Sequence, residues 1–434
     1  MTTPHSAPTL DTGTGYGRPR SSHDARLTEV GPGTPMGEAL RRYWHPVASS
    51  GGLGDMPHRF RLLGEDLVVF RDGAGRPGVV FERCAHRGSS LFYGRIEEDG
   101  IRCCYHGWKF DVQGHCLEQA CEPGLGRRRD AVRQPWYPVE ERYGLVFVYM
   151  GPPERKPLLP RYDFLEELGE DESIFVQLDE PERQATGLLH DYNWLQAFEN
   201  SMDPVHLPWL HYTHSGRQFD GVGEPDGLPH SLFDPYKIAE RVGGRYERTE
   251  RGVMQRLSME REEPDGSIRA IEWHMEAQLP NIIALTDFVQ VVPDRPHDCL
   301  LWMVPSDDTS FRVFIAARAT SPQRLANVLN GIRQNGKLPW EVTEAEQHKF
   351  PGDFEAQRSQ GPITQHSEET LATSDKGIVL LRRQLRQMVD DVEAGHDPQN
   401  IDPGETGPCS TTSGYFTAGI RTAEPATAAA AQDS

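Results

Sequence analysis

The chain has 434 residues, of which 37% are hydrophobic, so it is long enough for two or three domains with ordinary buried cores. Its 45 basic and 65 acidic residues give a formal net charge of -20, which repels nucleic-acid phosphates and anionic lipid surfaces. No apolar run reaches the roughly 20 residues that span a bilayer, and the N-terminus lacks the pattern of a signal peptide. We therefore expect a cytoplasmic protein with neither nucleic-acid nor membrane partners.

Both ends of the chain are rich in Gly, Pro, Ser, Thr and Ala and have no periodic apolar face. We predict a disordered tail over residues 1–25 and a mostly disordered tail over 401–434. Around Gly151 the apolar stretch "YGLVFVYM" runs into the proline-rich "GPPERKPLLP", which is typical of a domain boundary. We therefore expect one domain over 26–155 and a second over 156–400.

The predicted elements differ between the two domains. The first begins with a helix in "TPMGEALRRYW", with Thr34 as N-cap and Pro35 in the first turn, and continues with the short alternating runs "RFRLLG", "DLVVFRD" and "GVVFERC". The second has a helix at about Tyr192 to Met202, longer strand candidates and an amphipathic helix in "SDKGIVLLRRQLRQMVDDVEAG". These strand candidates are "IRAIEWHMEAQL", "IIALTDFVQVV" and "FRVFIAARA". The predicted fold class is α+β, with an all-β N-terminal domain.

Two cysteines and two histidines stand in two mixed pairs, Cys84-x-His86 and Cys103-x2-His106, with sixteen residues between them. A zinc finger usually keeps its two cysteines on one hairpin and its two histidines on one helix. In a Rieske [2Fe–2S] centre two cysteines bind one iron and two histidines bind the other, and two mixed loops deliver that arrangement. The pattern favours a Rieske centre, and the alternative is a structural zinc site.

The other cysteines do not resemble a secreted disulfide framework, because the total of seven is odd and four lie between Cys103 and Cys121. We interpret Cys104, Cys116 and Cys121 as small packing residues. An oxidation-sensitive thiol at one of these positions is the alternative.

A second group of metal-binding residue types lies in "HDYNWLQAFENSMDPVHLPWLH", which contains His206 and His211. On an ideal helix two residues five positions apart point about 140° away from each other. Pro208 breaks the helical hydrogen bonding between them, and such a break lets both imidazoles converge. Two histidines and one carboxylate leave open positions on non-heme Fe(II). The alternatives are zinc, ordinary packed histidines, and a helix N-cap role for Asp203 before Pro204.

These stretches resemble the alpha subunits of Rieske non-heme iron oxygenases, nearest the phthalate dioxygenase-like group. The family wording is close to "CPHRG" and "CxYHGW", where this chain has "CAHRG" and "CCYHGW". The resemblance implies that Cys84 and Cys103 bind one cluster iron and that His86 and His106 bind the other.

The same resemblance covers the second group, in which a pair of histidines follows an "NxxDxxH" pattern. It implies that His206 and His211 bind a mononuclear Fe(II) and that Asp203 is the carboxylate that links a ligand histidine to the Rieske centre of a neighbouring subunit. The segment "FPGDFEAQRSQGPI" is similar to the phthalate dioxygenase branch and implies Asp353 as the third iron ligand, with Glu355 and Glu346 as second choices. The following "QHSEETLATSD" departs from the branch, where the text is nearer "DRSxEHLGxSD".

The family implies a small antiparallel Rieske domain, a helix-grip catalytic domain and a head-to-tail homotrimer. A separate reductase with flavin and an iron–sulfur cluster, fed by NADH or NADPH, is expected to reduce the Rieske centre, since the chain has no dinucleotide fingerprint of its own. An electron is expected to pass from His106 through Asp203 to the iron, where O2 and an aromatic or related organic substrate meet. The basic run Arg127 to Arg129 is either a reductase-docking site or a solvated surface.

The residues leave the reaction open among dihydroxylation, monohydroxylation and oxidative demethylation, and they do not identify the substrate. A different class of function is a Rieske electron-transfer or redox-sensing protein whose second domain has no oxygenase activity. A zinc-binding structural protein is the third possibility.

Overall fold

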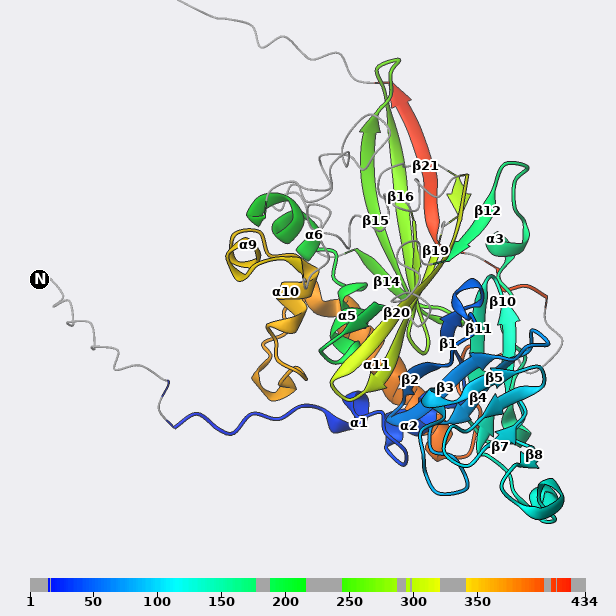
Figure 1. Ribbon diagram of the computed structural model, residues 1–434. Helices are drawn as coiled ribbons and strands as arrows, with labels where there is room; N and C mark the ends of the chain where they lie inside the picture. The colour runs from blue at the N-terminus through cyan, green and yellow to red at the C-terminus, as the bar shows by residue number, and fades with distance from the viewer. Residues whose placement is uncertain are drawn as a thin grey trace, which may run out of the picture.

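The computed structural model describes residues 15, 17–176, 188–215, 244–286, 294–296, 299–320, 341–401, 407–410 and 412–422. Figure 1 shows a β-rich N-terminal unit packed against one end of a larger sheet, which has helices on one side. No helix of the described part is both long enough and apolar enough to cross a bilayer.

The N-terminal unit is built from short antiparallel strands in three sheets, ordered β1-β11-β10, β2-β3-β4-β9 and β5-β6-β7-β8. The strands are β1 (Trp44–Ser49), β2 (His58–Leu62), β3 (Glu65–Arg71), β4 (Pro77–Phe81), β5 (Arg95–Glu97), β6 (Gly100–Arg102), β7 (Trp108–Phe110), β8 (Cys116–Gln119), β9 (Trp136–Tyr137), β10 (Val139–Arg142) and β11 (Leu145–Tyr149). Two helices precede them, α1 (Ala25–Thr28) and α2 (Pro35–Leu40). Short 3-10 turns are η1 (Ser50–Gly52), η2 (Leu91–Tyr93), η3 (Pro123–Leu125), η4 (Arg129–Ala131) and η5 (Pro153–Arg155).

The second unit is a ten-stranded antiparallel sheet with the order β12-β20-β19-β17-β16-β15-β14, to which β13, β18 and β21 add. Its strands are β12 (Ser173–Val176), β13 (Leu188–His190), β14 (Arg245–Arg248), β15 (Gly252–Glu262), β16 (Ser267–Gln278), β17 (Ile282–Leu285), β18 (Arg295–Pro296), β19 (Cys299–Asp307), β20 (Ser310–Ala319) and β21 (Gly414–Thr422). Its helices are α3 (Asp163–Glu166), α5 (Trp194–Asn200), α6 (His206–Pro208), the π-helix η6 (Trp209–His214), α9 (Glu344–Lys349), α10 (Asp353–Arg358), η9 (His366–Glu368), η10 (Thr373–Asp375) and α11 (Lys376–Glu393).

Local sequence signals account for the helix ends and faces. Thr34 accepts a hydrogen bond from Gly37 N and Pro35 opens α2, which confirms the predicted cap. Helix α11 buries Leu381, Leu385, Met388 and Val389, as its predicted apolar stripe requires. The α+β class is therefore confirmed.

One large hydrophobic core extends through both units, and a smaller second cluster lies around Cys84 and Cys103 in the N-terminal unit. Leu63 N donates to Pro305 O at 3.0 Å, so the turn after β2 is joined to β19. The rings of Phe60 and Phe314 lie 6.1 Å apart across the same junction. The domain limits at 155 and 400 stay predictions.

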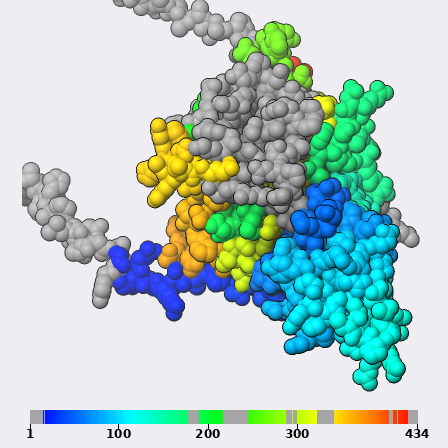
Figure 2. Space-filling view, viewed as in Figure 1, coloured from blue at the N-terminus to red at the C-terminus, as the bar shows by residue number. Residues whose placement is uncertain are grey.

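Two parts of the predicted tails are ordered, so those predictions were wrong there. Residues Gly414–Thr422 form β21 along β16, where its backbone groups find partners in a strand more than a hundred residues earlier. At the other end, Ser22 and Ser367 exchange two hydrogen bonds, and Asp24 N donates to His366 Nδ1 at 3.1 Å. Figure 2 shows this blue segment beside the orange residues. Composition alone does not reveal partners so distant in sequence.

Residues 1–14, 402–406 and 423–434, and the part of "IIALTDFVQVV" from 287 on, lie outside the described residues.

Candidate metal centres

The two loops that carry the Cys and His pairs have the same backbone arrangement. In the loops 84–89 and 103–108 the cysteine N–H donates to the carbonyl five residues later, at 2.9 and 2.8 Å. The glycine four residues after each cysteine donates back to the cysteine carbonyl, at 2.8 and 3.1 Å. Gly88 and Gly107 both have positive φ, +74° and +68°, which favours glycine. The two loops therefore present their cysteines in the same way, whereas His86 follows its cysteine by two residues and His106 by three.

The four side chains sort into a buried sulfur pair and a more exposed imidazole pair. Cys84 and Cys103 are each 3% exposed, whereas His86 and His106 are partly exposed, with ring centroids 4.6 Å apart. The hydrogen bond from the Cys84 thiol lowers the pKa of Cys103 to about 5, and the same contact raises the pKa of Cys84. This contact favours the thiolate form of Cys103, and the thiolate is the form that binds metals.

Two residues outside the predicted set fix these loops. Gln134, which is fully buried, accepts from Ala85 N at 2.7 Å and donates to Phe81 O and Arg83 O. Trp108 stacks on His86 with ring centroids 4.3 Å apart and an interplanar angle of 6°. Trp108 stands in the "CCYHGW" motif, but no local signal marks Gln134.

The nearby cysteines do not all pack as predicted. Cys116 is buried, as expected, but Cys104 and Cys121 are exposed. Cys104 lies within the second ligand loop, where only Cys103 turns into the interior. The packing interpretation was therefore wrong for Cys104 and Cys121. Arg127 and Arg128 are exposed and Arg129 is partly exposed, and a docking role for them stays a prediction.

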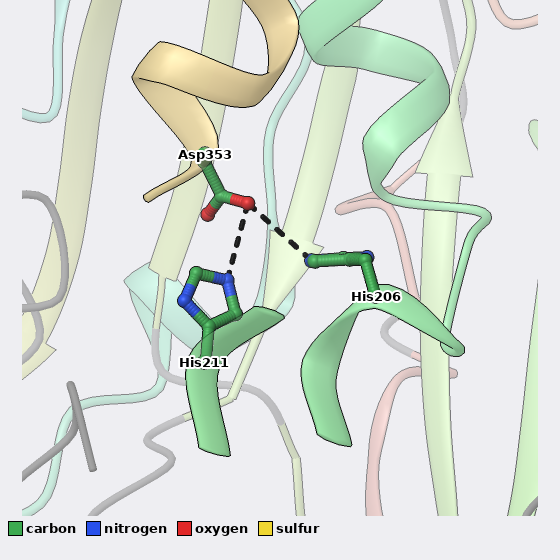
Figure 3. A group of neighbouring side chains, drawn as sticks. All are labelled: His206, His211 and Asp353. Atoms are coloured by element: carbon green, nitrogen blue, oxygen red, sulfur yellow. Dashed lines mark hydrogen bonds and ion pairs between the residues drawn. The ribbon is translucent and has the colours of Figure 1, made fainter. Parts of the chain in front are cut away.

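The second group converges on one point, as Figure 3 shows for His206, His211 and Asp353. Nε2 of His211 lies 3.1 Å from Asp353 Oδ1, and Nε2 of His206 lies 3.6 Å from the same oxygen. One ligand atom from each residue lies within 4.8 Å of the other two. The structure therefore brings together the three residues proposed as iron ligands.

The backbone between the two histidines explains their convergence. Helix α6 is only three residues long, and directly after Pro208 the chain continues as the π-helix η6, whose turns are wider than those of an α-helix. The ring centroids of His206 and His211 lie 5.4 Å apart, and the rings meet edge to face with an interplanar angle of 71°. The break expected at Pro208 is present and takes the form of a change in helix type.

Asp203 and Asn200 surround His206. Nδ1 of His206 hydrogen-bonds to the backbone carbonyl of Asp203, so Nδ1 carries the proton and Nε2 keeps its lone pair for a metal. The Asp203 carboxylate lies 3.9 Å from the same nitrogen and is 30% exposed. Asn200 Nδ2 lies 3.4 Å from both His206 Nε2 and Asp353 Oδ1. Asn200 had no predicted role.

Asp353 is the first residue of α10, and its environment favours the carboxylate form. Burial alone raises the pKa of Asp353, but the charge and hydrogen bond of His211, with His206 and Asn200, hold it well below its usual range. The second choices are engaged elsewhere: Glu355 accepts from Gly352 N at 2.8 Å, and Glu346 from Thr343 N at 2.9 Å, so each caps its own helix. In the described part of the chain neither joins the group of His206 and His211.

A buried ion-pair network anchors the helix next to this site. Arg382 of α11 donates to both carboxylate oxygens of Glu199, at 2.5 and 2.7 Å, and to Glu369 at 2.6 Å. Arg382 is 6% exposed and Glu199 9%. Burial raises the pKa of Glu199, and Arg382 opposes that effect. Because Glu199 precedes Asn200, the network fixes the end of α5 that faces the candidate metal ligands.

Comparison with known proteins supports the Rieske centre and relates most of the chain to oxygenase subunits. The family model of the Rieske [2Fe-2S] domain matches residues 43–130. The chain is 47% identical over 399 residues to phenoxybenzoate dioxygenase subunit alpha of Ectopseudomonas oleovorans, covering 90% of both chains. It is 29% identical over 398 residues to the phthalate 4,5-dioxygenase oxygenase subunit of Pseudomonas putida, covering 85% of this chain and 86% of that one. A solved structure, the NdmA QL mutant of Pseudomonas putida CBB5 with caffeine, has the same fold, with a TM-score of 0.57 and 19% identity over 86% of this chain and 100% of that one.

Proposed function

Because this chain belongs to the Rieske non-heme iron oxygenases, we propose that it oxidises an aromatic acid of the aryl-ether type, at an iron held by His206, His211 and Asp353. It is the terminal oxygenase component of a multicomponent system, with a Rieske [2Fe–2S] cluster, a mononuclear iron and electrons from a separate reductase. The alternative of an electron carrier without oxygenase activity does not fit a chain related to oxygenase subunits over 90% of its length.

The convergence of two imidazole nitrogens and one carboxylate is the observation that carries the site assignment. This donor set suits Fe(II) and leaves open coordination positions. When bound, the iron supplies the redox chemistry that activates O2. The low pKa of Asp353 favours a charged ligand, and the carbonyl of Asp203 orients His206. Asn200 lies against both ligands and limits their movement.

The residues of the loops 84–89 and 103–108 likewise suit a Rieske [2Fe–2S] cluster. Their buried Cys84 and Cys103 suit the inner iron, and the partly exposed His86 and His106 suit the iron nearer the surface. An electron would then enter and leave through the imidazole side. This geometry supports the ligand assignment made from the motif.

We further propose that the active form is a homotrimer in which electrons cross between copies. In Figure 1 the strands β5, β7 and β8 lie at the lower right and α6 and α10 at the left, so the two candidate centres occupy different ends of one chain. In this proposal the Asp203 carboxylate, which is partly exposed, accepts a hydrogen bond from His106 of a neighbouring copy. A cytoplasmic location fits this proposal, because NADH and NADPH supply the reductase there.

The substrate class rests on the relative that is named for phenoxybenzoate. The test is O2 uptake by the iron-loaded oxygenase with NADH, a generic flavin and iron–sulfur reductase, and 3-phenoxybenzoate. We expect substrate-dependent uptake, and product mass spectrometry under ¹⁸O2 then separates insertion of one oxygen atom from insertion of two. Iron content is measured in parallel: the two cluster irons and one more per chain support the site. Full iron without uptake would rule out this substrate and leave the metal centre standing.

A further inference from the structure

One face of the large sheet is turned toward the candidate metal ligands. Residues directly opposite each other on neighbouring strands share a face, as do residues two apart on one strand. A continuous path on one face therefore joins β15 to β13 through the pairs Gln255↔Met275, Ala277↔Ile283, Ile283↔Leu301, Met303↔Val313 and Phe311↔His190. The His190 ring lies 6.0 Å from that of Phe354, the residue after Asp353. This is the metal-facing side of the sheet.

Gln255 is a polar side chain among apolar neighbours on this face. Its neighbours on β15 are Val253 and Leu257, and Met275 lies opposite, so its surroundings are apolar. Gln255 is 1% exposed, and neither Oε1 nor Nε2 has a hydrogen-bond partner among the described residues. Buried amides are normally paired, because an unpaired one loses its hydration without compensation.

Tyr246 has the same property beside it. Tyr246 is the partner of Gln255 on β14 and therefore points to the same face. Its buried hydroxyl also has no partner among the described residues. Two adjacent strands thus present unpaired hydrogen-bonding groups side by side on this face.

The pair lies next to the chain segment that carries the candidate ligands. A Cβ atom on Gly377 of α11 would lie 2.5 Å from the Tyr246 ring and 2.5 Å from Met202 O. Tyr246 therefore sits beside Met202, which directly precedes Asp203. Burial, and next the charge of Asp203, raise the pKa of Tyr246, which keeps its hydroxyl protonated and able to donate.

We propose that the Gln255 amide and the Tyr246 hydroxyl bind an oxygen substituent of the aromatic substrate, and so determine specificity. This proposal rests on the proposed function. Gln255 Nε2–H and Tyr246 O–H both donate to an oxygen acceptor, while Leu257 and Met275 contact the ring. Both groups are neutral, and an aryl ether oxygen or a carboxylate oxygen has the required acceptor chemistry.

The test uses Gln255→Leu and Tyr246→Phe, which remove the polar atoms and keep most of the volume. The control is Met254→Leu, because Met254 is buried and points to the opposite face. Dissociation constants are measured by calorimetry on iron-loaded protein with three probes: 3-phenoxybenzoate, 3-benzylbenzoate without the ether oxygen, and diphenyl ether without the carboxylate. Where O2 uptake occurs, KM and kcat are measured as well.

We expect Gln255→Leu to weaken 3-phenoxybenzoate about 5- to 10-fold, with KM rising and kcat nearly constant. The probe that lacks the oxygen recognised by Gln255 is expected to bind the Gln255→Leu variant as tightly as it binds the wild type. Whichever probe behaves in this way identifies the recognised group as the ether oxygen or the carboxylate. Equal losses for all three probes would indicate damaged packing and overturn the proposal, as would no change for any probe or no binding of any probe to the wild type. Binding of 3-phenoxybenzoate without O2 uptake would refute the proposed activity. The affinities of the three probes for wild type and variants would still decide whether Gln255 and Tyr246 bind an oxygen substituent.

Discussion

The Asp353 carboxylate lies 3.1 Å from Nε2 of His211, although the two residues are 142 positions apart in the chain. Asp353 comes from the first turn of α10, and His211 from a π-helix on the other side of the group. Tertiary packing alone brings them together, and the carboxylate is held charged where two imidazole nitrogens also point. Two imidazole nitrogens and one carboxylate oxygen that converge in this way match the donor set of a bound cation.

Asp353→Ala is expected to remove the mononuclear iron and abolish turnover while the red-brown Rieske absorption survives. The reason is that two neutral imidazoles alone hold Fe(II) weakly. The measurements are iron content per chain, the visible spectrum and O2 uptake. Glu355→Gln is the matched control, because Glu355 lies on the same helix and only caps it. Loss of the Rieske spectrum in Asp353→Ala would mean misfolding rather than loss of a ligand.

Asp203→Asn is expected to keep both metal centres and to slow electron delivery about 10- to 100-fold. The backbone carbonyl of Asp203, not its side chain, holds Nδ1 of His206, so the substitution leaves that imidazole oriented. Single-turnover experiments that start from reduced clusters measure the step. An unchanged rate would remove Asp203 from the proposed path between copies.

The sequence predicted what depends on local pattern. The Thr34 cap, helix α11 and the paired loops around Cys84 and Cys103 follow from residues within a few positions of one another. Asp353 was different, since 65 acidic residues offer no spacing rule and only family resemblance selected it. The strand β21 was missed because its partner β16 lies far away in the chain.

The supporting residues were also missed, for the same physical reason. Gln134 acts on Ala85 across 49 positions, and Asn200 reaches Asp353 across 153. No sequence periodicity marks an Asn or Gln side chain as one that will hold a loop or a ligand in place. Its hydrogen bonds form only when the fold brings the partner groups close to it. Such residues become visible when buried hydrogen bonds are traced through the structure.

Arg382→Met is expected to lower the free energy of unfolding by about 3–5 kcal/mol, because it leaves the buried carboxylates of Glu199 and Glu369 without their cation. Chemical denaturation monitored by circular dichroism measures the change. Arg386→Met is the control: its pair with Asp24 is partly exposed to solvent and contributes less than about 1 kcal/mol. Similar losses in both variants would show that the buried network has no special role.

Because the imidazole of His45 is buried, we expect the free energy of unfolding to fall in mild acid. Burial lowers the pKa of His45 to about 4 from its ordinary value of 6.5. The unfolded chain therefore takes up the proton first, so the stability present above pH 6.5 is lost as the pH falls toward 4, by about 3 kcal/mol in total. Denaturation midpoints between pH 7 and 4 test this. In His45→Gln the pH dependence is expected to be shallower, and an identical slope would exclude His45 as the cause.

Gly377→Ala tests whether α11 must lie close to the chain that leads to the candidate iron ligands. The added methyl group would lie 2.5 Å from both Met202 O and the Tyr246 ring, and neither backbone nor a buried ring moves freely. We expect α11 to be displaced, with a loss of about 1–3 kcal/mol in stability and weaker retention of the mononuclear iron against a chelator. Gly51→Ala is the control, since nothing lies within 4 Å of its added carbon. If Gly377→Ala lost stability but kept its iron as firmly as the wild type, the packing of α11 would matter for folding alone, and the position of Asp203 and His206 would have to be fixed by α5 and the Glu199–Arg382 pair.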